Sequence, residues 1–295
     1  MRHFTRLVVA LAAVAPIMPG QVTAQGHDLS VDFRMTETGM SGGKPITGSG
    51  TGHAVISAGR ARYDMAGNSR MMAIPGTAAG DSVTLILLDS GTTFIYLQPK
   101  KKTYIRFRPV EMMEGMQKMM EGMGGSMKFE VTGSEPKVEK IGGGPDILGH
   151  HTTHYRISGT MNVRMAAMDQ THAMEMKSEV DEYVAEDMAN LMDPFRNLGS
   201  NMMGGILGAS AKEYMDKMKA ARAKVPGLPL RAATHAFVSG EGQGSDMKSV
   251  QEITALHMIT AEPSLFEPPA DYKPMTIPEM TGMSHVRDSL PPTKH

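Results

Sequence analysis

The chain has 295 residues, of which 30 are Met, none is Cys and none is Trp. Lys and Arg together number 30 and Asp and Glu number 31, so the formal net charge is −1. This balance argues against a nucleic-acid-binding protein, which needs a basic surplus or a basic stripe. The absence of Cys excludes disulfides, thiolate metal sites, cysteine nucleophiles and a lipid-modified N-terminal cysteine.

The N-terminus predicts export from the cytoplasm. A basic start, Arg2 to Arg6, precedes an apolar run from Leu7 to Ala15, and the small residues Val22-Thr23-Ala24 follow. These three features are typical of a secretory signal peptide. The apolar run is too short to span the ~30 Å of a bilayer core. We therefore expect residues 1–24 to be cleaved near Ala24 and the mature chain to reside in the periplasm.

Residues 28–107 have the period of β-strands. Leu29, Val31, Phe33 and Met35 are apolar at every second position, which indicates a strand with one buried face. Asp89-Ser90-Gly91 is typical of a hairpin turn between two such segments. The other strand-like segments are 53–57, 60–66, 82–88, 92–97 and 103–107. Short consecutive strands of this kind predict an antiparallel meander.

The period changes after Pro109, a residue suited to the first turn of a helix. At ~100° per residue, the methionines of segment 110–123 fall within an arc of about 120°. They are Met112, Met113, Met116, Met119, Met120 and Met123. Charged and amide side chains occupy the rest of the circumference, so we expect an amphipathic helix with a methionine face that ends at Gly124-Gly125.

The second half returns to strands and contains one more helical region. Strands are expected at 127–131, 137–141, 147–164, 172–176, 179–185, 228–237 and 248–259. Residues 187–225 are helical in character, with breaks near Pro194 and Gly204. The apolar face of the last part of that region consists of Ala211, Tyr214, Met215, Met218, Ala221 and Val225. Residues 276–295, rich in Pro, Thr and Met, are expected to form a disordered tail.

These elements predict an α+β fold without a βαβ rhythm. We expect a strongly curved antiparallel sheet that forms an open, unclosed β-barrel. Met-rich amphipathic helices would cover or plug its concave face. A single domain over residues 25–275 would account for the whole folded part of the chain.

Five short sequence motifs, in order, resemble an uncharacterised family of exported bacterial domains that is similar in fold to the periplasmic lipoprotein carriers LolA and LolB. The motifs are Phe94–Tyr104, Ile147–Ile157, Glu182–Asp187, Gly227–Arg231 and Leu265–Tyr272. The resemblance covers roughly residues 28–275. It implies an unclosed barrel with helices over an apolar cavity, which the carriers use for acyl chains, and it assigns no functional residue.

The methionines permit three interpretations. They can be ordinary packing, they can line a cavity that adapts to varied apolar ligands, or they can bind Cu(I), because soft thioethers select that ion. Seven lie in 112–127, five in 161–176 and six in 188–218, a spread that favours packing or a cavity. The expected cavity lining is Met112, Met116, Met119, Met120, Met123, Tyr214, Met215 and Met218. The alternative copper ligands are Met113, Met116 and Met120.

The remaining motifs offer little catalytic chemistry. His150 and His154 would lie ~13 Å apart on a strand, too far for one ion. His172, with Met174 and Met176 on the same strand face, is a weaker candidate for a soft metal. Gly-x-Ser-x-Gly, His-Glu-x-x-His and a phosphate-binding loop are all missing from the sequence.

We therefore expect a monomeric, non-enzymatic periplasmic protein without a cofactor that binds or carries a hydrophobic, lipid-like ligand. Its partners would be an apolar small molecule or lipid and possible contacts with the membrane or an envelope protein, but not nucleic acid. The alternatives are a Met-rich periplasmic copper-binding protein, and a structural domain that docks on a membrane partner through its methionine face.

Overall fold

The computed structural model describes residues 28–41, 43–68, 81–112, 114–115, 127–167, 170–189, 211–240 and 244–276. The expected signal peptide, 1–24, and nearly all of the expected tail lie outside these ranges. Among the helices that the structure describes, none combines the length and the apolar character needed to cross a bilayer.

The first half of the chain is the predicted antiparallel meander. Its strands are β1 (Asp28–Ser41), β2 (Lys44–Ser57), β3 (Arg60–Gly67), β4 (Val83–Leu88), β5 (Thr93–Gln98) and β6 (Thr103–Phe107). Each strand pairs with the next in antiparallel register. The turn predicted at Asp89–Gly91 is a short 3-10 helix, η2, and a second one, η3 (Pro99–Lys101), joins β5 to β6.

The second half adds longer strands. They are β7 (Met127–Gly133), β8 (Lys137–Gly143), β9 (Thr152–Ala167), β10 (Gln170–Ala185), β11 (Leu228–Gly240), β12 (Ser245–Ile259) and β13 (Lys273–Pro274). The strand expected over 147–164 begins later, because residues 147–150 form a tight turn closed by a bridge between Ile147 and His150. β9 and β10 pair over sixteen residue positions and form the longest hairpin of the described chain.

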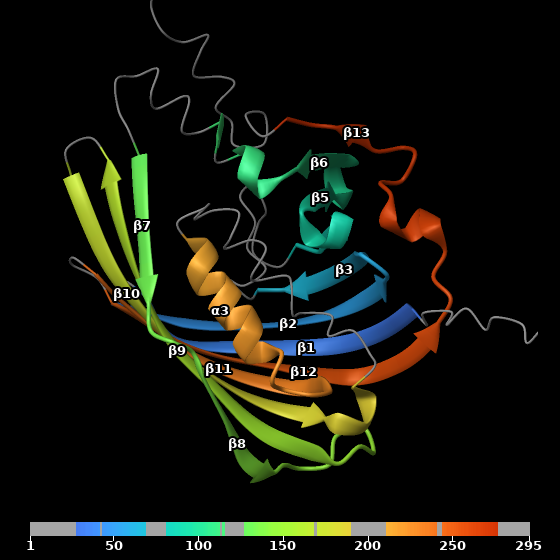
Figure 1. The fold of residues 1–295 in the computed structure, drawn as a ribbon. Coiled ribbons are helices and arrows are strands. Elements are labelled where there is room, and N and C mark those ends of the chain that lie inside the picture. The colour runs from blue at the N-terminus through green and yellow to red at the C-terminus, as the bar shows by residue number, and fades with distance from the viewer. Residues whose placement is uncertain are drawn as a thin grey trace, which may run out of the picture.

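All thirteen strands belong to one sheet, in the order β13-β6-β5-β4-β3-β2-β1-β12-β11-β10-β9-β7, with β8 also paired to β9 (Figure 1). β1 pairs with β12 along its whole length, from Asp28 opposite Ile259 to Ser41 opposite Ser245. This pairing joins the two halves of the chain into a continuous surface. The short β13 pairs with β6 and is the parallel exception.

The predicted α+β fold, with a strongly curved barrel-like sheet and Met-rich helices that cover or plug it, is wrong. In the part of the chain that the structure describes, most residues belong to the sheet, the sheet is neither closed nor strongly curled, and the helices are few and short. Helix α3 (Lys212–Arg222) has 11 residues, so it is ~17 Å long, whereas the twelve strands that lie side by side span roughly 53 Å across the sheet. A helix of that length covers one part of the sheet and cannot plug a barrel.

The predicted methionine helix is described only at its start. Residues 109–112 and 114–115 are helical, and the amide of Met112 donates to the carbonyl of Arg108 at 3.1 Å, as an α-helix requires. Within the second predicted helical region, the structure describes η4 (Glu186–Met188) and α3. The intervening residues 190–210 lie outside the described part of the chain.

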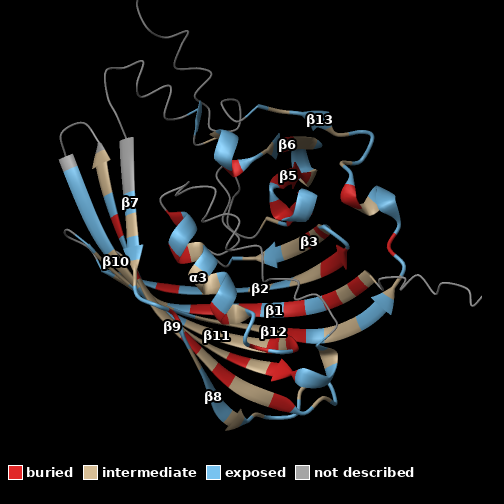
Figure 2. Cartoon of the chain, in the orientation of Figure 1, coloured by how far each residue is buried: buried red, intermediate tan, exposed pale blue. Residues whose placement is uncertain are grey.

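The two faces of the sheet differ in polarity, as the alternation of β1 predicts. We call the face that carries Leu29, Val31 and Phe33 the inner face, and the face that carries Asp32 and Arg34 the outer face. The side chains of the inner face are buried along β1 and those of the outer face are exposed (Figure 2). A core of apolar side chains therefore runs along the inner face from β1 to β5 and continues to β11 and β12.

Part of the outer face is covered by the C-terminal segment. The 3-10 helix η6 (Pro263–Phe266) packs on the outer face of β2, β4 and β5, where Phe266 is only 1% exposed. The guanidinium of Arg60 lies 4.6 Å from the centre of the Phe266 ring. Strands β4 and β5 are therefore buried on both faces, which is why their sequences are almost continuously apolar.

Candidate functional site

Helix α3 lies on the inner face of the sheet near β7, β9 and β10 (Figure 1). Its buried residues are Tyr214 and Ala221, while Met215 and Met218 are half-buried. These four residues belong to the apolar face predicted from the sequence, and the structure confirms that this face packs on the sheet. The helix places Tyr214 in one cluster with Met161 of β9.

Two glycines of the sheet make room for the Tyr214 ring. A β-carbon on Gly133, the last residue of β7, would lie 2.4 Å from Cδ2 of Tyr214. A β-carbon on Gly159 of β9 would lie 3.0 Å from the phenol oxygen of Tyr214 and 3.7 Å from the sulfur of Met218. The ring thus sits in a depression of the sheet that only glycine leaves open. Burial raises the pKa of the Tyr214 phenol above its ordinary value.

The end of α3 is held by an ion pair. Arg222, in the last turn, places Nη1 2.9 Å from Oε1 of Glu182 on β10. The Glu182 side chain is 5% exposed and the Arg222 side chain 29%. A cation in the last turn also complements the negative end of the helix dipole. The apolar contacts of Tyr214 and this ion pair therefore fix α3 on the inner face at two points.

A ladder of methionines continues from this contact along β9 and β10. Met161 lies directly opposite Met176, and Val163 lies opposite Met174. Exposure increases along the ladder: Met161 is 5% exposed, Met176 is half-buried and Met174 is 36% exposed. We call Met161, Met176, Met215 and Met218 the methionine cluster, because they pack together between α3 and the sheet.

The structure brings together part of the predicted cavity lining. Tyr214, Met215 and Met218 meet in the methionine cluster, while Met112 is half-buried at the start of the other helical segment. The remaining predicted residues, including all three alternative copper ligands, lie outside the described part of the chain; they are Met113, Met116, Met119, Met120 and Met123. Met161 and Met176 were not among the predicted site residues. Each lies at an alternating apolar position of a strand-like segment, which could have indicated a place on the buried face. The sequence does not show the strand register that places the two residues opposite each other.

The outer face carries polar chemistry of another kind. Five histidines each lie within 2.6–2.8 Å of an aspartate oxygen. The pairs are His53 with Asp32, His150 with Asp187, His151 with Asp146, His154 with Asp181 and His235 with Asp246. The repetition indicates that a histidine beside an aspartate is a recurrent arrangement in the described part of this protein.

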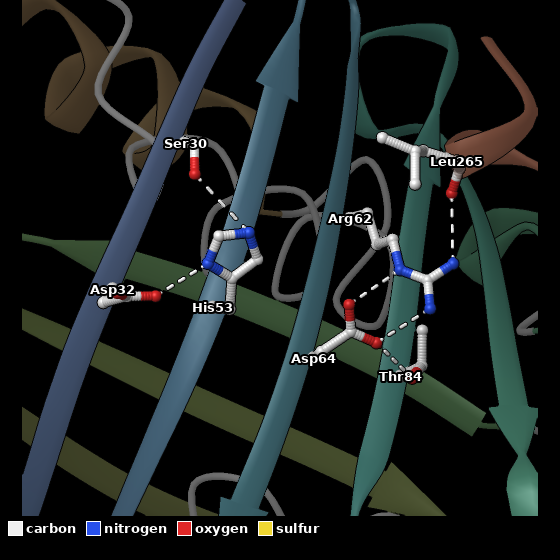
Figure 3. Close-up of polar contacts among 7 residues, drawn as sticks. All are labelled: Ser30, Asp32, His53, Arg62, Asp64, Thr84 and Leu265. Carbon is white, nitrogen blue, oxygen red and sulfur yellow. Dashed lines mark hydrogen bonds and ion pairs between the residues drawn. The ribbon is translucent and has the colours of Figure 1, made fainter. Parts of the chain in front are cut away.

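One of these pairs has a serine beside it. Nδ1 of His53 lies 2.7 Å from Asp32, and Nε2 lies 3.5 Å from Oγ of Ser30 (Figure 3). The order of groups is that of a nucleophile, a base and an acid. The side chains of His53 and Asp32 are, however, 45% and 56% exposed. Since four other His–Asp pairs occur without a serine, we interpret this group as surface pairing and assign no nucleophile to it.

A second polar group on the outer face anchors the C-terminal segment. Arg62 makes two hydrogen bonds to the carboxylate of Asp64, at 2.7 and 2.9 Å, and a third to the carbonyl of Leu265 at 3.2 Å (Figure 3). Burial alone would raise the pKa of Asp64, but hydrogen bonds from Arg62 and Thr84 lower it overall. The ion pair orients Arg62 within β3, and the hydrogen bond from Arg62 to the Leu265 carbonyl connects β3 to η6, so this group has a structural role.

A groove of about 610 Å³ runs beside both polar groups. Asp32, Arg34, His53 and Asp64 line it, so charges of both signs border the space. Across the ranges that the structure describes, no three His, Asp or Glu side chains come together as a metal site would require.

No protein-family model matches the chain, and no curated protein is significantly similar to it in sequence. Two structures of PNGF-II, in space groups C2 and P21, align with 86% of the chain at 10% and 9% identity and TM-scores of 0.27 and 0.23. The chain spans about a third of PNGF-II, 32% and 33% of the two chains.

A further solved structure is a domain described as an outer membrane lipoprotein-sorting protein, from Vibrio parahaemolyticus. It aligns with 82% of this chain and 89% of its own, at 9% identity and a TM-score of 0.20. The similarity to a lipoprotein-sorting domain is therefore distant.

Proposed function

We propose that this protein binds a hydrophobic, lipid-like ligand on its inner face, at the methionine cluster, and that it acts as a non-enzymatic binding or carrier protein of the periplasm. The observation that carries the proposal is the incomplete burial of three facing thioethers. Met176 of β10 and Met215 and Met218 of α3 are half-buried, although they lie beside fully buried aliphatic side chains.

Incomplete burial leaves part of the available hydrophobic free energy unused. Covering a Met side chain completely contributes ~1.5–3 kcal/mol, so a half-buried one forgoes about 1 kcal/mol. An apolar ligand that slides between α3 and the sheet would recover this free energy for each of the three methionines. Methionine suits that role because its unbranched side chain rearranges at little cost and accepts ligands of different shape.

The way α3 is attached supports entry of a ligand at this position. The helix is held by one aromatic contact on Gly133 and Gly159 and by the ion pair between Arg222 and Glu182. Neither contact involves Met176 or Met215, so these half-buried thioethers can move apart to admit a ligand while Tyr214 and Arg222 hold the helix. The proposed periplasmic location rests on the basic and apolar N-terminal sequence of residues 1–24.

Lipid analysis of the protein purified from a bacterial periplasm tests the proposal directly. We expect organic extraction and mass spectrometry to recover a lipid in an amount comparable to the protein. We also expect an environment-sensitive apolar dye to bind the delipidated protein and to be displaced by a fatty acid. A protein that yields no lipid and binds no dye would refute the proposal.

A matched pair of variants on α3 locates the ligand. Met218→Gln replaces a half-buried thioether of the methionine cluster by an amide of similar length, and Lys219→Gln changes the exposed neighbour. We expect Met218→Gln to weaken dye binding about tenfold, because a buried amide without a partner costs ~1–3 kcal/mol, and Lys219→Gln to leave it unchanged. Equal effects of the two substitutions would place the ligand elsewhere.

A further inference from the structure

The far end of the methionine ladder has a composition that hydrophobic packing does not explain. In the register of the β9–β10 hairpin, Met165 lies directly opposite His172, and Met174 lies two residues from His172 on the same strand. Alternation along a strand places all three on the inner face, together with Met161 and Met176. The end of the ladder therefore presents two thioethers and one imidazole on the same face of the sheet.

These three side chains are accessible. Met174 is 36% exposed, His172 is exposed and Met165 is half-buried, whereas Met161 at the other end of the ladder is 5% exposed. Met174 is exposed and gains little from the hydrophobic effect, so packing does not account for a thioether at this position.

The spacing of the three residues suits a single ion. Directly opposed residues of an antiparallel pair have β-carbons ~4.5–5.5 Å apart, and residues two apart on one strand are ~7 Å apart. The Met side chain has three rotatable bonds and can direct its sulfur sideways over this range. Met165, Met174 and His172 can thus bring two sulfurs and one nitrogen to a common point.

The type of donor selects the ion. Thioethers are soft ligands that bind Cu(I), whereas Mg²⁺ and Ca²⁺ require several carboxylate or carbonyl oxygens. The charged neighbours on this hairpin, Arg164 and Glu175, alternate to the outer face, where both line a groove of about 490 Å³ that Met174 also borders. The three inner-face side chains comprise two thioethers and one imidazole and no oxygen donor, so a soft monovalent cation is the ion that this set fits.

We propose that Met165, His172 and Met174 form a binding site for a soft monovalent cation, Cu(I) or its analogue Ag(I). This site differs from the one that the sequence indicated at Met113, Met116 and Met120. Those three residues were chosen by their spacing on a predicted helix, whereas the residues proposed here are brought together by the register of β9 and β10. The proposed site shares no residue with the methionine cluster, so the two proposals can be tested separately.

Competition for Cu(I) tests the site. The purified protein, kept reduced with ascorbate, is titrated with Cu(I) in the presence of a chromogenic Cu(I) chelator, and Ag(I) is used as a second probe. We expect the first Cu(I) ion bound per protein molecule, at the site of highest affinity, to bind with a sub-micromolar dissociation constant. Substituting His172→Ala together with Met174→Leu is expected to weaken binding of that ion by at least about a hundredfold, ~2.8 kcal/mol.

Two control variants separate this site from the other soft donors of the chain. Met215→Leu with Met218→Leu removes two thioethers of the methionine cluster, and His235→Ala removes an exposed imidazole on the outer face. We expect both controls to bind Cu(I) as the unsubstituted protein does. Micromolar or weaker binding by the unsubstituted protein overturns the proposal, as does a loss of affinity in a control that matches the loss in the His172 and Met174 variant.

X-ray absorption on the Cu(I)-loaded, unsubstituted protein gives a readout that does not depend on folding of a variant. We expect a three-coordinate ion with two sulfur ligands and one nitrogen ligand. Coordination by sulfur alone, or by nitrogen and oxygen alone, would contradict the assignment. Lipid content of the protein serves as a separate readout, because failure of the copper site leaves the apolar-ligand proposal untouched and the reverse also holds.

Discussion

The ring of Tyr214 occupies the space in which a side chain of Gly133 would stand: a β-carbon there would lie 2.4 Å from Cδ2 of the ring. The two residues belong to elements far apart in the sequence, α3 and β7, and their contact seats the helix on the sheet. The depression under the ring therefore depends on the absence of a single carbon atom.

Gly133→Ala tests this relationship. The added methyl group must displace the Tyr214 ring, and overpacking of this kind costs about 1–3 kcal/mol. We expect the urea midpoint, followed by circular dichroism, to fall accordingly. Gly143→Ala is the matched control, because Gly143 is likewise the last residue of a strand and a β-carbon there meets nothing within 4 Å. A control variant as unstable as Gly133→Ala would show that the loss comes from glycine flexibility and not from the ring.

The ion pair between Arg222 and Glu182 should contribute more to the free energy of unfolding than the ion pair between Lys217 and Glu213 on the same helix. In Arg222→Met, the Glu182 carboxylate, 5% exposed, loses a charged partner at 2.9 Å. A buried charged group deprived of a hydrogen bond costs about 1–3 kcal/mol, so we expect a loss of free energy of unfolding in that range. The measurement is urea unfolding at pH 7.

The control for that substitution lies on the same helix. Lys217 pairs with Glu213 one turn away, and the Glu213 side chain is 83% exposed. An exposed pair of this spacing contributes only ~0.3–0.5 kcal/mol, so Lys217→Met should change the stability by no more than that. Similar losses in the two variants would mean that Glu182 is solvated in solution and that its pairing does not fix the helix.

The free energy of unfolding should depend on whether Asp181, on the outer face, is ionised. Hydrogen bonds from Arg156, and then from His154, hold the pKa of Asp181 below its ordinary value of 3.8. A carboxylate whose pKa is lower in the folded than in the unfolded chain stabilises the fold above about pH 4. That contribution is lost as the pH falls through the folded-state pKa.

The variant Asp181→Asn isolates this contribution. We expect it to be less stable than the unsubstituted protein at pH 7, because Arg156 and His154 lose an ionised partner, and to approach the same stability once the pH falls below the folded-state pKa of Asp181. Urea unfolding of both proteins between pH 2 and pH 7 gives the comparison. A difference that stays constant over this range would show that the carboxylate charge makes no pH-dependent contribution.

The sequence predicted local structure better than it predicted arrangement. Alternation along β1 identified Leu29, Val31, Phe33 and Met35 as the buried side chains, and the structure confirms this. The prediction was possible because a strand with one covered face has apolar residues at every second position. The apolar face of α3 was recognisable for the same reason, with a period of 3.6. Each of these predictions needs only the residues of one element.

Curvature, strand order and register depend on residues far apart in the sequence, and there the prediction failed. The apolar periodicity of a strand does not show which strand or residue it pairs with, so the pairing of β1 with β12, or of Met161 with Met176, could not be predicted. The barrel was inferred from strands that must hide one face, but an open sheet hides its inner face as well. The same limit applies to the candidate site: Tyr214 was found from its helix, whereas Gly133 and Gly159 beneath it were not distinguishable from turn glycines.

The inner face contains a second contact between an aromatic ring and a glycine, which offers a test of the sheet core. Three glycines of β2 lie directly opposite large side chains of β1, and the pairs are Glu37 with Gly48, Met35 with Gly50 and Phe33 with Gly52. At the last of them, a β-carbon on Gly52 would lie 2.3 Å from Cζ of Phe33, so the ring lies flat over the glycine. The ring covers backbone that glycine alone would leave open to solvent.

Gly52→Ala should therefore lower the free energy of unfolding by about 1–3 kcal/mol, because Phe33 is 2% exposed and has little space into which to move. Phe33→Leu should be destabilising by itself, since it leaves a gap over Gly52. In the double variant, the new methyl group fills part of that gap, so we expect the two losses to be less than additive by about 1 kcal/mol. Urea unfolding of the four proteins measures this coupling, and strictly additive losses would show that the ring does not rest on Gly52 in solution.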